Sequence, residues 1–141
     1  MIVGLSESQK ATYIDSVFEK VRLKASGCYM KWYCVSILMY ADDILLLAPS
    51  VSSLQNLLGI CENELLNLDM CLNVRKFMCT RVGPRYKLKC SNLVTNDSRE
   101  ILWVDNVRYL GVFIVSSSRF AAHLITQRNH FIEPLTLCLA K

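Results

Sequence analysis

The chain has 141 residues, 52% of them hydrophobic, and its sixteen lysines and arginines outnumber its twelve acids to give a formal net charge of +4. That length and apolar content are enough for one domain with its own core, and no apolar run approaches the ~20 residues that a membrane-spanning helix requires. The mild positive charge suits a phosphate-bearing partner without requiring one.

The first predicted element is a helix over residues 6–24. Ser6 and Gln9 are spaced as a capping box at its start. Gly27 follows its end. Apolar side chains recur on one face of this helix at Tyr13, Val17, Phe18 and Val21. A helix with a single apolar stripe packs that stripe on a sheet or on another helix.

Two apolar runs, Cys34 to Tyr40 and Ile44 to Ala48, are separated by a short polar break and predict a β-hairpin. Ala41, Asp42 and Asp43 would form its turn, where aspartate tolerates unusual backbone angles. Adjacent acids among so much hydrocarbon are costly unless a cation or hydrogen-bond donors offset them. A hard divalent metal is one natural partner. The alternative is an ordinary turn, because many aspartate-containing turns have no other role.

A second helix is predicted to begin after Pro49 and to bury one stripe as ordinary core packing, with Glu62 on another face. The stripe consists of Val51, Leu54, Leu58, Cys61, Leu65 and Leu68. Strands are then expected at 77–82 and 85–88, followed by a polar loop over 91–99. Two more strands are expected near 100–104 and 108–115, and a helix near 119–131 closes the pattern.

Basic residues gather around Gly83-Pro84, at Arg75, Lys76, Arg81, Arg85, Lys87 and Lys89. A strand-turn-strand arrangement would present them along one side of a hairpin, where they could contact a phosphate backbone. Such contacts contribute affinity and salt dependence rather than sequence preference. The alternative is a solvated, positively charged turn.

Seven cysteines, an odd number with no Cys-x-x-Cys pair, favour reduced thiols that behave as small buried hydrophobes. His123 and His130 lack partners at zinc-ligand spacing. No amino-terminal segment has the basic start, apolar core and small-residue cleavage site of a secretory signal. An intracellular location, nuclear or cytoplasmic, is therefore expected.

Four segments carry a resemblance to a known family, and the predicted helix from Ser50 to Met70 is one of them. Tyr40-Ala41-Asp42-Asp43, flanked by apolar strands, resembles the polymerase signature of non-LTR retrotransposon (LINE-type) reverse transcriptases. Leu72-Asn73-Val74-Arg75-Lys76 is similar to the family's Leu-Asn-x-x-Lys block, and Tyr109-Leu110-Gly111 looks like its primer-grip segment. The resemblance covers roughly residues 13–120. It implies an α+β fold in which residues 1–118 form a partial polymerase palm, an antiparallel sheet packed by helices, and residues 119–141 begin a thumb-like helix.

The resemblance also implies roles for individual residues. Asp42 would be the principal metal ligand, with Asp43 as its partner or support, and the ion would be Mg²⁺ or Mn²⁺. Tyr40 and Ala41 would shape the floor under the primer end and the incoming nucleotide.

Lys76 would protonate or neutralise the departing pyrophosphate, and Tyr109, Leu110 and Gly111 would position the primer strand. The implied partners are an RNA template, a DNA primer and a deoxynucleoside triphosphate. As plain structure, Lys76 is a surface lysine and Tyr109 a strand aromatic.

This sequence departs from the family pattern in several places. Glu7 stands where proline is usual, Lys10 where phenylalanine is usual, and Phe77 where serine or threonine is usual. The family's earlier catalytic aspartate would fall before Met1. Two-metal nucleotidyl transfer needs carboxylates that hold two Mg²⁺ ions about 4 Å apart, so Asp42 and Asp43 alone would support one weak ion site.

The expectation is thus a partial palm with little activity of its own, whose missing palm and fingers would come from another chain. The alternative is a non-catalytic remnant that binds nucleic acid.

Overall fold

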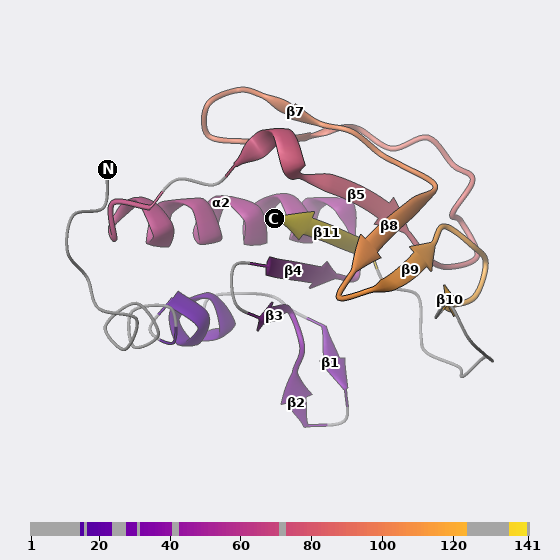
Figure 1. Ribbon diagram of the computed structural model, residues 1–141, viewed down its shortest axis with the longest axis horizontal. Helices are drawn as coiled ribbons and strands as arrows, with labels where there is room; N and C mark the ends of the chain where they lie inside the picture. Colours follow the sequence, from indigo (N-terminus) through magenta and orange to yellow (C-terminus); the bar gives the residue numbers. More distant parts are fainter. Residues whose placement is uncertain are drawn as a thin grey trace.

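The computed structural model describes residues 15, 17–23, 28–30, 32–40, 43–70, 73–123 and 136–140. These residues form helices packed on small, mainly antiparallel sheets, which confirms the expected α+β class (Figure 1). The predicted capping box at Ser6 and Gln9, and Tyr13 of the first apolar stripe, lie outside the described residues.

A four-stranded sheet forms the centre of the fold, in the order β3-β4-β11-β5 with every neighbouring pair antiparallel. Its strands are β3 (Ile37–Tyr40), β4 (Asp43–Ala48), β5 (Met78–Arg81) and β11 (Thr136–Ala140). All residues of β4 after Asp43 are buried. Because successive side chains of a strand point to opposite faces, this continuous apolar run means that both faces of β4 are covered.

The first face is covered by two helices. Helix α2 (Val51–Leu66) begins at Ser50, whose hydroxyl accepts a hydrogen bond from the Ser53 amide at 3.1 Å, a typical N-cap. The core on this face joins α2 and the helix over residues 17–23 to alternate residues of the sheet, and it includes Val17, Val21, Ile44, Leu46, Leu54, Leu57, Leu58, Cys61 and Leu65. An ion pair of 3.1 Å between Lys20 Nζ and a carboxylate oxygen of Glu64 also joins the helices.

The second face is covered by a three-stranded antiparallel sheet in the order β10-β9-β8. Its strands are β8 (Asn106–Tyr109), β9 (Val112–Val115) and β10 (Ala121–His123). Val107 and Ile114 of this sheet pack with Leu45 and Leu47, the residues of β4 that point away from the helices. Strand β4 therefore lies between two separate cores.

Shorter elements complete the described fold. Strands β1 (Tyr29–Met30) and β2 (Tyr33–Cys34) form one small ladder, β6 (Leu93–Val94) and β7 (Glu100–Ile101) form another, and η1 (Val74–Lys76) is a single 3₁₀ turn. Gln55 fastens the second ladder to α2, because its side-chain nitrogen donates to the Val94 carbonyl at 2.6 Å and its oxygen accepts from the Val94 amide at 2.8 Å.

Two predicted strands are corrected by the structure. Residues 85–88 form consecutive turns, in which the Tyr86 amide donates to the Gly83 carbonyl at 3.0 Å and the Leu88 amide to the Arg85 carbonyl at 3.1 Å. Pro84 favours this outcome because its ring fixes φ for the second position of a turn and it has no N–H to donate to a ladder. The predicted strand over 108–115 is instead the β8–β9 hairpin, which reverses at Leu110 and Gly111.

The helix predicted near 119–131 is wrong at residues 121–123, which form β10 against β9. The alanines there favour a helix in isolation, but the free edge of β9 supplies ladder partners and overrides that preference. Strand β11 was not predicted, and where residues 119–141 are described the ordered elements are strands rather than a thumb-like helix. The division into a palm over 1–118 and a thumb over 119–141 stays a prediction.

Glu62, predicted on another face of α2 than the apolar stripe, is nevertheless buried. One of its carboxylate oxygens accepts a hydrogen bond from the Asn96 amide at 3.0 Å. Burial raises the pKa of Glu62, the Asn96 hydrogen bond lowers it, and the negative charge of Asp97 raises it again, with a net increase. Glu62 thus ties α2 to the loop between β6 and β7 while it carries an unfavourable charge.

Replacement of Glu62 by glutamine is expected to raise the free energy of unfolding at pH 7. Because the folded pKa of Glu62 lies above its unfolded pKa, the protonated form is favoured by folding, and that contribution is lost as pH rises through the folded pKa. Glutamine is neutral and keeps an oxygen for the Asn96 amide. The difference in free energy of unfolding between Glu62→Gln and the natural sequence should therefore vanish below about pH 4, where Glu62 is protonated in both states. Urea unfolding at both pH values measures this, with exposed Glu19→Gln as the control; an equal effect at both pH values would contradict it.

Candidate functional site

Asp43 is the first residue of β4 and pairs with Tyr40, the last residue of β3. The structure therefore places Asp43 in the strand rather than in the turn that was predicted for it. Its side chain is half-buried, whereas Tyr40 is exposed. Ala41 and Asp42, which connect the two strands, lie outside the described residues.

Tyr109 lies close enough to Asp43 for the two side chains to interact electrostatically. Burial raises the pKa of the Tyr109 phenol, and the negative charge of Asp43 raises it further. Tyr109 ends β8, on the sheet that covers the second face of β4, and so comes from a part of the chain far from Asp43 in sequence. The structure thus brings together two of the predicted site residues.

Leu110 and Gly111 form a two-residue turn directly after Tyr109, because Tyr109 pairs with Val112. Both turn residues have positive φ, 47° at Leu110 and 80° at Gly111, as a two-residue hairpin turn that matches the twist of its strands requires. Gly111 adopts this conformation without strain, since it has no Cβ. Leu110 does not, and strained non-glycine residues cluster at functional sites.

Replacement of Leu110 by asparagine is expected to stabilise the fold by about 1 kcal/mol. Asparagine followed by glycine is the preferred pair for this turn, and a branched apolar residue in the left-handed region costs roughly 1–2 kcal/mol. The Leu110 side chain is 49% exposed, so little packing is lost. Thermal unfolding measures the change, with Leu102→Asn, at an exposed leucine outside the turn, as the control. A decrease in stability would show that the Leu110 side chain packs more favourably than its backbone is strained.

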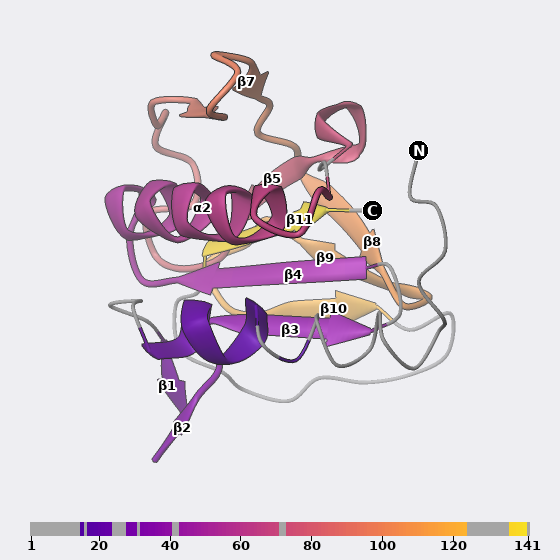
Figure 2. The same ribbon diagram turned by 90° about the vertical axis from the view of Figure 1, so that its left-hand side faces the viewer.

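Lys76, at the end of η1, is exposed and lies at the same end of the central sheet as Asp43. Met78 of β5 pairs with Leu139 of β11, and the next residue of β11, Ala140, pairs with Ile44. Figure 2 shows this end of the sheet, where β4 begins, η1 precedes β5, and β8 turns into β9. No carboxylate among the described residues lies within salt-bridge distance of the Lys76 amine.

One described residue at this end of the sheet offers ligands for a hard cation. Asp43 supplies carboxylate oxygens, the ligand type that Mg²⁺ prefers, but the part of the chain that the structure describes holds no group of three or more His, Cys, Asp or Glu residues able to enclose a metal. A carboxylate, a phenol and an exposed amine are gathered at this edge. Together they could bind a cation and the phosphates that accompany it.

Cys34, Cys61, Cys79 and Cys90 are free thiols, which agrees with the reduced cysteines that the sequence predicts. Burial, with a smaller contribution from the negative charge of Glu62, raises the pKa of Cys61 to about 12. This thiol stays protonated at neutral pH and acts as a core residue, as predicted.

The helices in the described ranges are all too short or too polar to cross a membrane.

Comparison with models of known protein families matches residues 5–114 to the family described as reverse transcriptase (RNA-dependent DNA polymerase). No curated protein and no solved structure matches the chain. The matched range covers well over half of the 141 residues and contains every predicted site residue, and the family's activity implies binding of a nucleic-acid template. The chain therefore belongs to the reverse transcriptase family.

Proposed function

We propose that this domain comes from a reverse transcriptase of a non-LTR retrotransposon and that its site for Mg²⁺ is formed by Asp42 and Asp43. The sequence Tyr40-Ala41-Asp42-Asp43 supports the class. The observation that carries the site is the convergence of Asp43, Tyr109 and η1 at one end of the central sheet. That convergence brings together residues from three of the sequence segments on which the resemblance rests.

Each residue at this edge has a role in the proposal. Asp42 and Asp43 hold Mg²⁺ or Mn²⁺, which when bound polarises phosphate oxygens and neutralises their charge. Lys76 places a positive charge where the pyrophosphate departs. Tyr40 and Ala41 form the floor beneath the primer end, and the turn at Leu110 and Gly111, where Gly111 has no side chain, lets the backbone approach the primer strand.

We further propose that a polypeptide of these 141 residues binds a DNA primer on an RNA template without extending it. Nucleotidyl transfer by two metal ions needs a set of carboxylates that grips both. Among the described residues, no acid lies grouped with Asp43 in a set large enough for that. Another segment or another chain would supply the remaining ligand.

Primer extension on an RNA template in Mg²⁺ or Mn²⁺ tests this proposal. We expect no extension by the 141-residue polypeptide, and we expect Mg²⁺ to strengthen binding of the primer–template in the natural sequence but not in Asp43→Asn. Extension that disappears in Asp43→Asn would overturn the proposed inactivity while it supports the site. If Mg²⁺ does not change primer–template binding in either protein, the assignment of the metal site to Asp42 and Asp43 would be wrong.

The exposed basic residues Arg85, Lys87 and Lys89 favour a second candidate, a domain that binds nucleic acid without catalysis. Cationic contacts to phosphates make binding weaken as salt increases. Salt-dependent binding that survives the loss of both Asp42 and Asp43 would favour this candidate over the metal-dependent one.

A further inference from the structure

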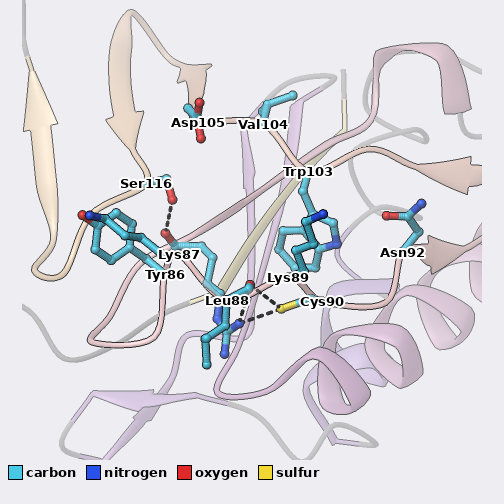
Figure 3. A pocket seen from close by; sticks show the side chains of 11 residues that line it. Tyr86, Lys87, Leu88, Lys89, Cys90, Asn92, Trp103, Val104, Asp105 and Ser116 are labelled. Atoms are coloured by element: carbon cyan, nitrogen blue, oxygen red, sulfur yellow. Dashed lines mark hydrogen bonds between the residues drawn. The ribbon is translucent and has the colours of Figure 1, made fainter.

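A cavity of about 350 Å³ opens between the turns that follow β5 and the segment that leads into β8 (Figure 3). Arg81, Lys87 and Lys89 line it from the first side, and Trp103 and Asp105 line it from the second. Its volume falls in the range of pockets that hold small organic ligands. The lining residues are scattered between positions 81 and 116, so only the fold assembles them.

The cavity lies at the opposite end of the sheet from Asp43. Arg81 pairs with Thr136, and Thr136 pairs with Ala48, the last residue of β4. Five residue steps of β4 separate that end from Asp43, roughly 16 Å at the rise of a β-strand. The cavity is therefore separate from the proposed metal site.

The charge of the cavity is positive, because its three cations outnumber the single carboxylate of Asp105. No acidic side chain of the described chain lies within 4.0 Å of the charged groups of Arg81, Lys87 or Lys89. Arg81 Nη1 instead contacts neutral acceptors, the Cys90 sulfur at 2.6 Å and the Leu88 carbonyl at 3.5 Å. These contacts orient the guanidinium and leave its charge available to an anion.

Aromatic rings accompany this charge. The Trp103 indole is held by a hydrogen bond from Nε1 to the Ser91 carbonyl at 3.1 Å. Tyr86 also lines the cavity, and Lys87 Nζ lies 5.6 Å from the centroid of its ring. In the view of Figure 3, Tyr86 and Trp103 stand on different sides of the cavity. Aromatic faces beside cations are the combination that binds single-stranded nucleic acid, by base stacking and phosphate contact.

We propose that this cavity binds a nucleoside phosphate, with the phosphate held by Arg81, Lys87 and Lys89 and the base stacked on Trp103. The same chemistry is offered by a free nucleotide and by one nucleotide of a single strand. The proposal is independent of the metal site, because the two sites lie at opposite ends of the sheet and share no residue. Failure of either test leaves the other interpretable.

Intrinsic fluorescence provides the test, since the chain has two tryptophans, Trp32 and Trp103. Trp32 is 92% exposed, so Trp32→Phe leaves Trp103 as the reporter in a folded background. This protein is titrated with thymidine monophosphate, with thymidine, with inorganic phosphate and with a short oligothymidylate. We expect saturable quenching of Trp103 that requires both base and phosphate. Quenching by the oligonucleotide alone identifies a single strand as the ligand, and equal affinity for the mononucleotide identifies a free nucleotide.

Charge variants distinguish ligand binding in the cavity from non-specific electrostatic attraction of the ligand to the protein. Arg81→Met is expected to weaken binding at least about tenfold, because hydrogen bonds to charged groups are among the stronger ones. Arg99→Met removes the same charge from an exposed residue that does not line the cavity, and should change affinity far less. Lys89→Met, at an exposed lining residue, repeats the test should Arg81→Met fail to unfold cooperatively. Equal losses in the Lys89 and Arg99 variants, or no quenching by any nucleotide ligand, would overturn the proposal.

Discussion

Simultaneous replacement of Asp42 and Asp43 by asparagine is expected to weaken Mn²⁺ binding at least about tenfold, since loss of even a supporting carboxylate typically costs that much. Asparagine keeps the size and one oxygen of the side chain but removes the negative charge that a hard cation requires. The fold should survive, because Asp43 is only half-buried and its strand is held by apolar neighbours. The electron paramagnetic resonance signal of free Mn²⁺ during titration gives the two affinities directly.

The matched control removes two acids elsewhere. Asp69 and Asp97 are both exposed, and asparagine also tolerates the positive φ of 55° at Asp69. Asp69→Asn with Asp97→Asn therefore lowers the number of acids equally and should leave Mn²⁺ affinity nearly unchanged. Should both double variants bind Mn²⁺ as the natural sequence does, membership of the reverse transcriptase family would stand but the assignment of the metal site would not.

Replacement of Cys138 by proline is expected to destabilise the fold by roughly 3 kcal/mol or more, a large part of the stability of a small domain. Cys138 is the middle residue of β11 and pairs with Leu46 on one side and Cys79 on the other. Proline cannot donate a ladder hydrogen bond, and it is found in sheets almost only at edges and bulges. The free energy of unfolding in urea measures the loss.

Cys138→Ala distinguishes the effect of losing the backbone N–H from the effect of losing the side chain, because alanine removes the same thiol and keeps the N–H. A large loss in Cys138→Pro with a much smaller one in Cys138→Ala would confirm that β11 is a central strand. Similar small effects in both variants would show that residues 136–140 contribute little to the sheet, and that β4 and β5 are held by other elements.

Local patterns predicted the elements whose neighbours agree with them. The apolar spacing of Leu54, Leu58, Cys61 and Leu65 predicted helix α2 and its buried stripe, and the predicted start after Pro49 agrees with the N-cap at Ser50. The apolar run after Asp43 predicted a strand, and β4 is that strand. The Tyr40-Ala41-Asp42-Asp43 and Tyr109-Leu110-Gly111 segments indicated the family that the comparison with family models then showed.

Errors arose where distant contacts override local preference. The alanines at 121 and 122 favour a helix alone, yet pairing with Val115 and Ile114 makes them a strand. Glu62 has the polarity of an outer position, but the loop that carries Asn96 folds over it. Leu110 is an unusual residue for a tight turn, so only the reversal of the chain between paired strands reveals it.

The amino-acid sequence by itself determined the family of this protein, its α+β class and the helix α2, because these depend on short motifs and on the periodicity of apolar side chains. The catalytic roles of Asp42, Asp43 and Lys76 stay predictions from the same motifs. The tertiary structure alone decided that β11 lies between β4 and β5, that Asp43 lies near Tyr109, and that scattered cations and aromatic rings enclose a cavity at the far end of the sheet. Those features depend on strand pairing between residues far apart in the chain. The free energy of such pairing is set by the burial of two cores and not by any local pattern.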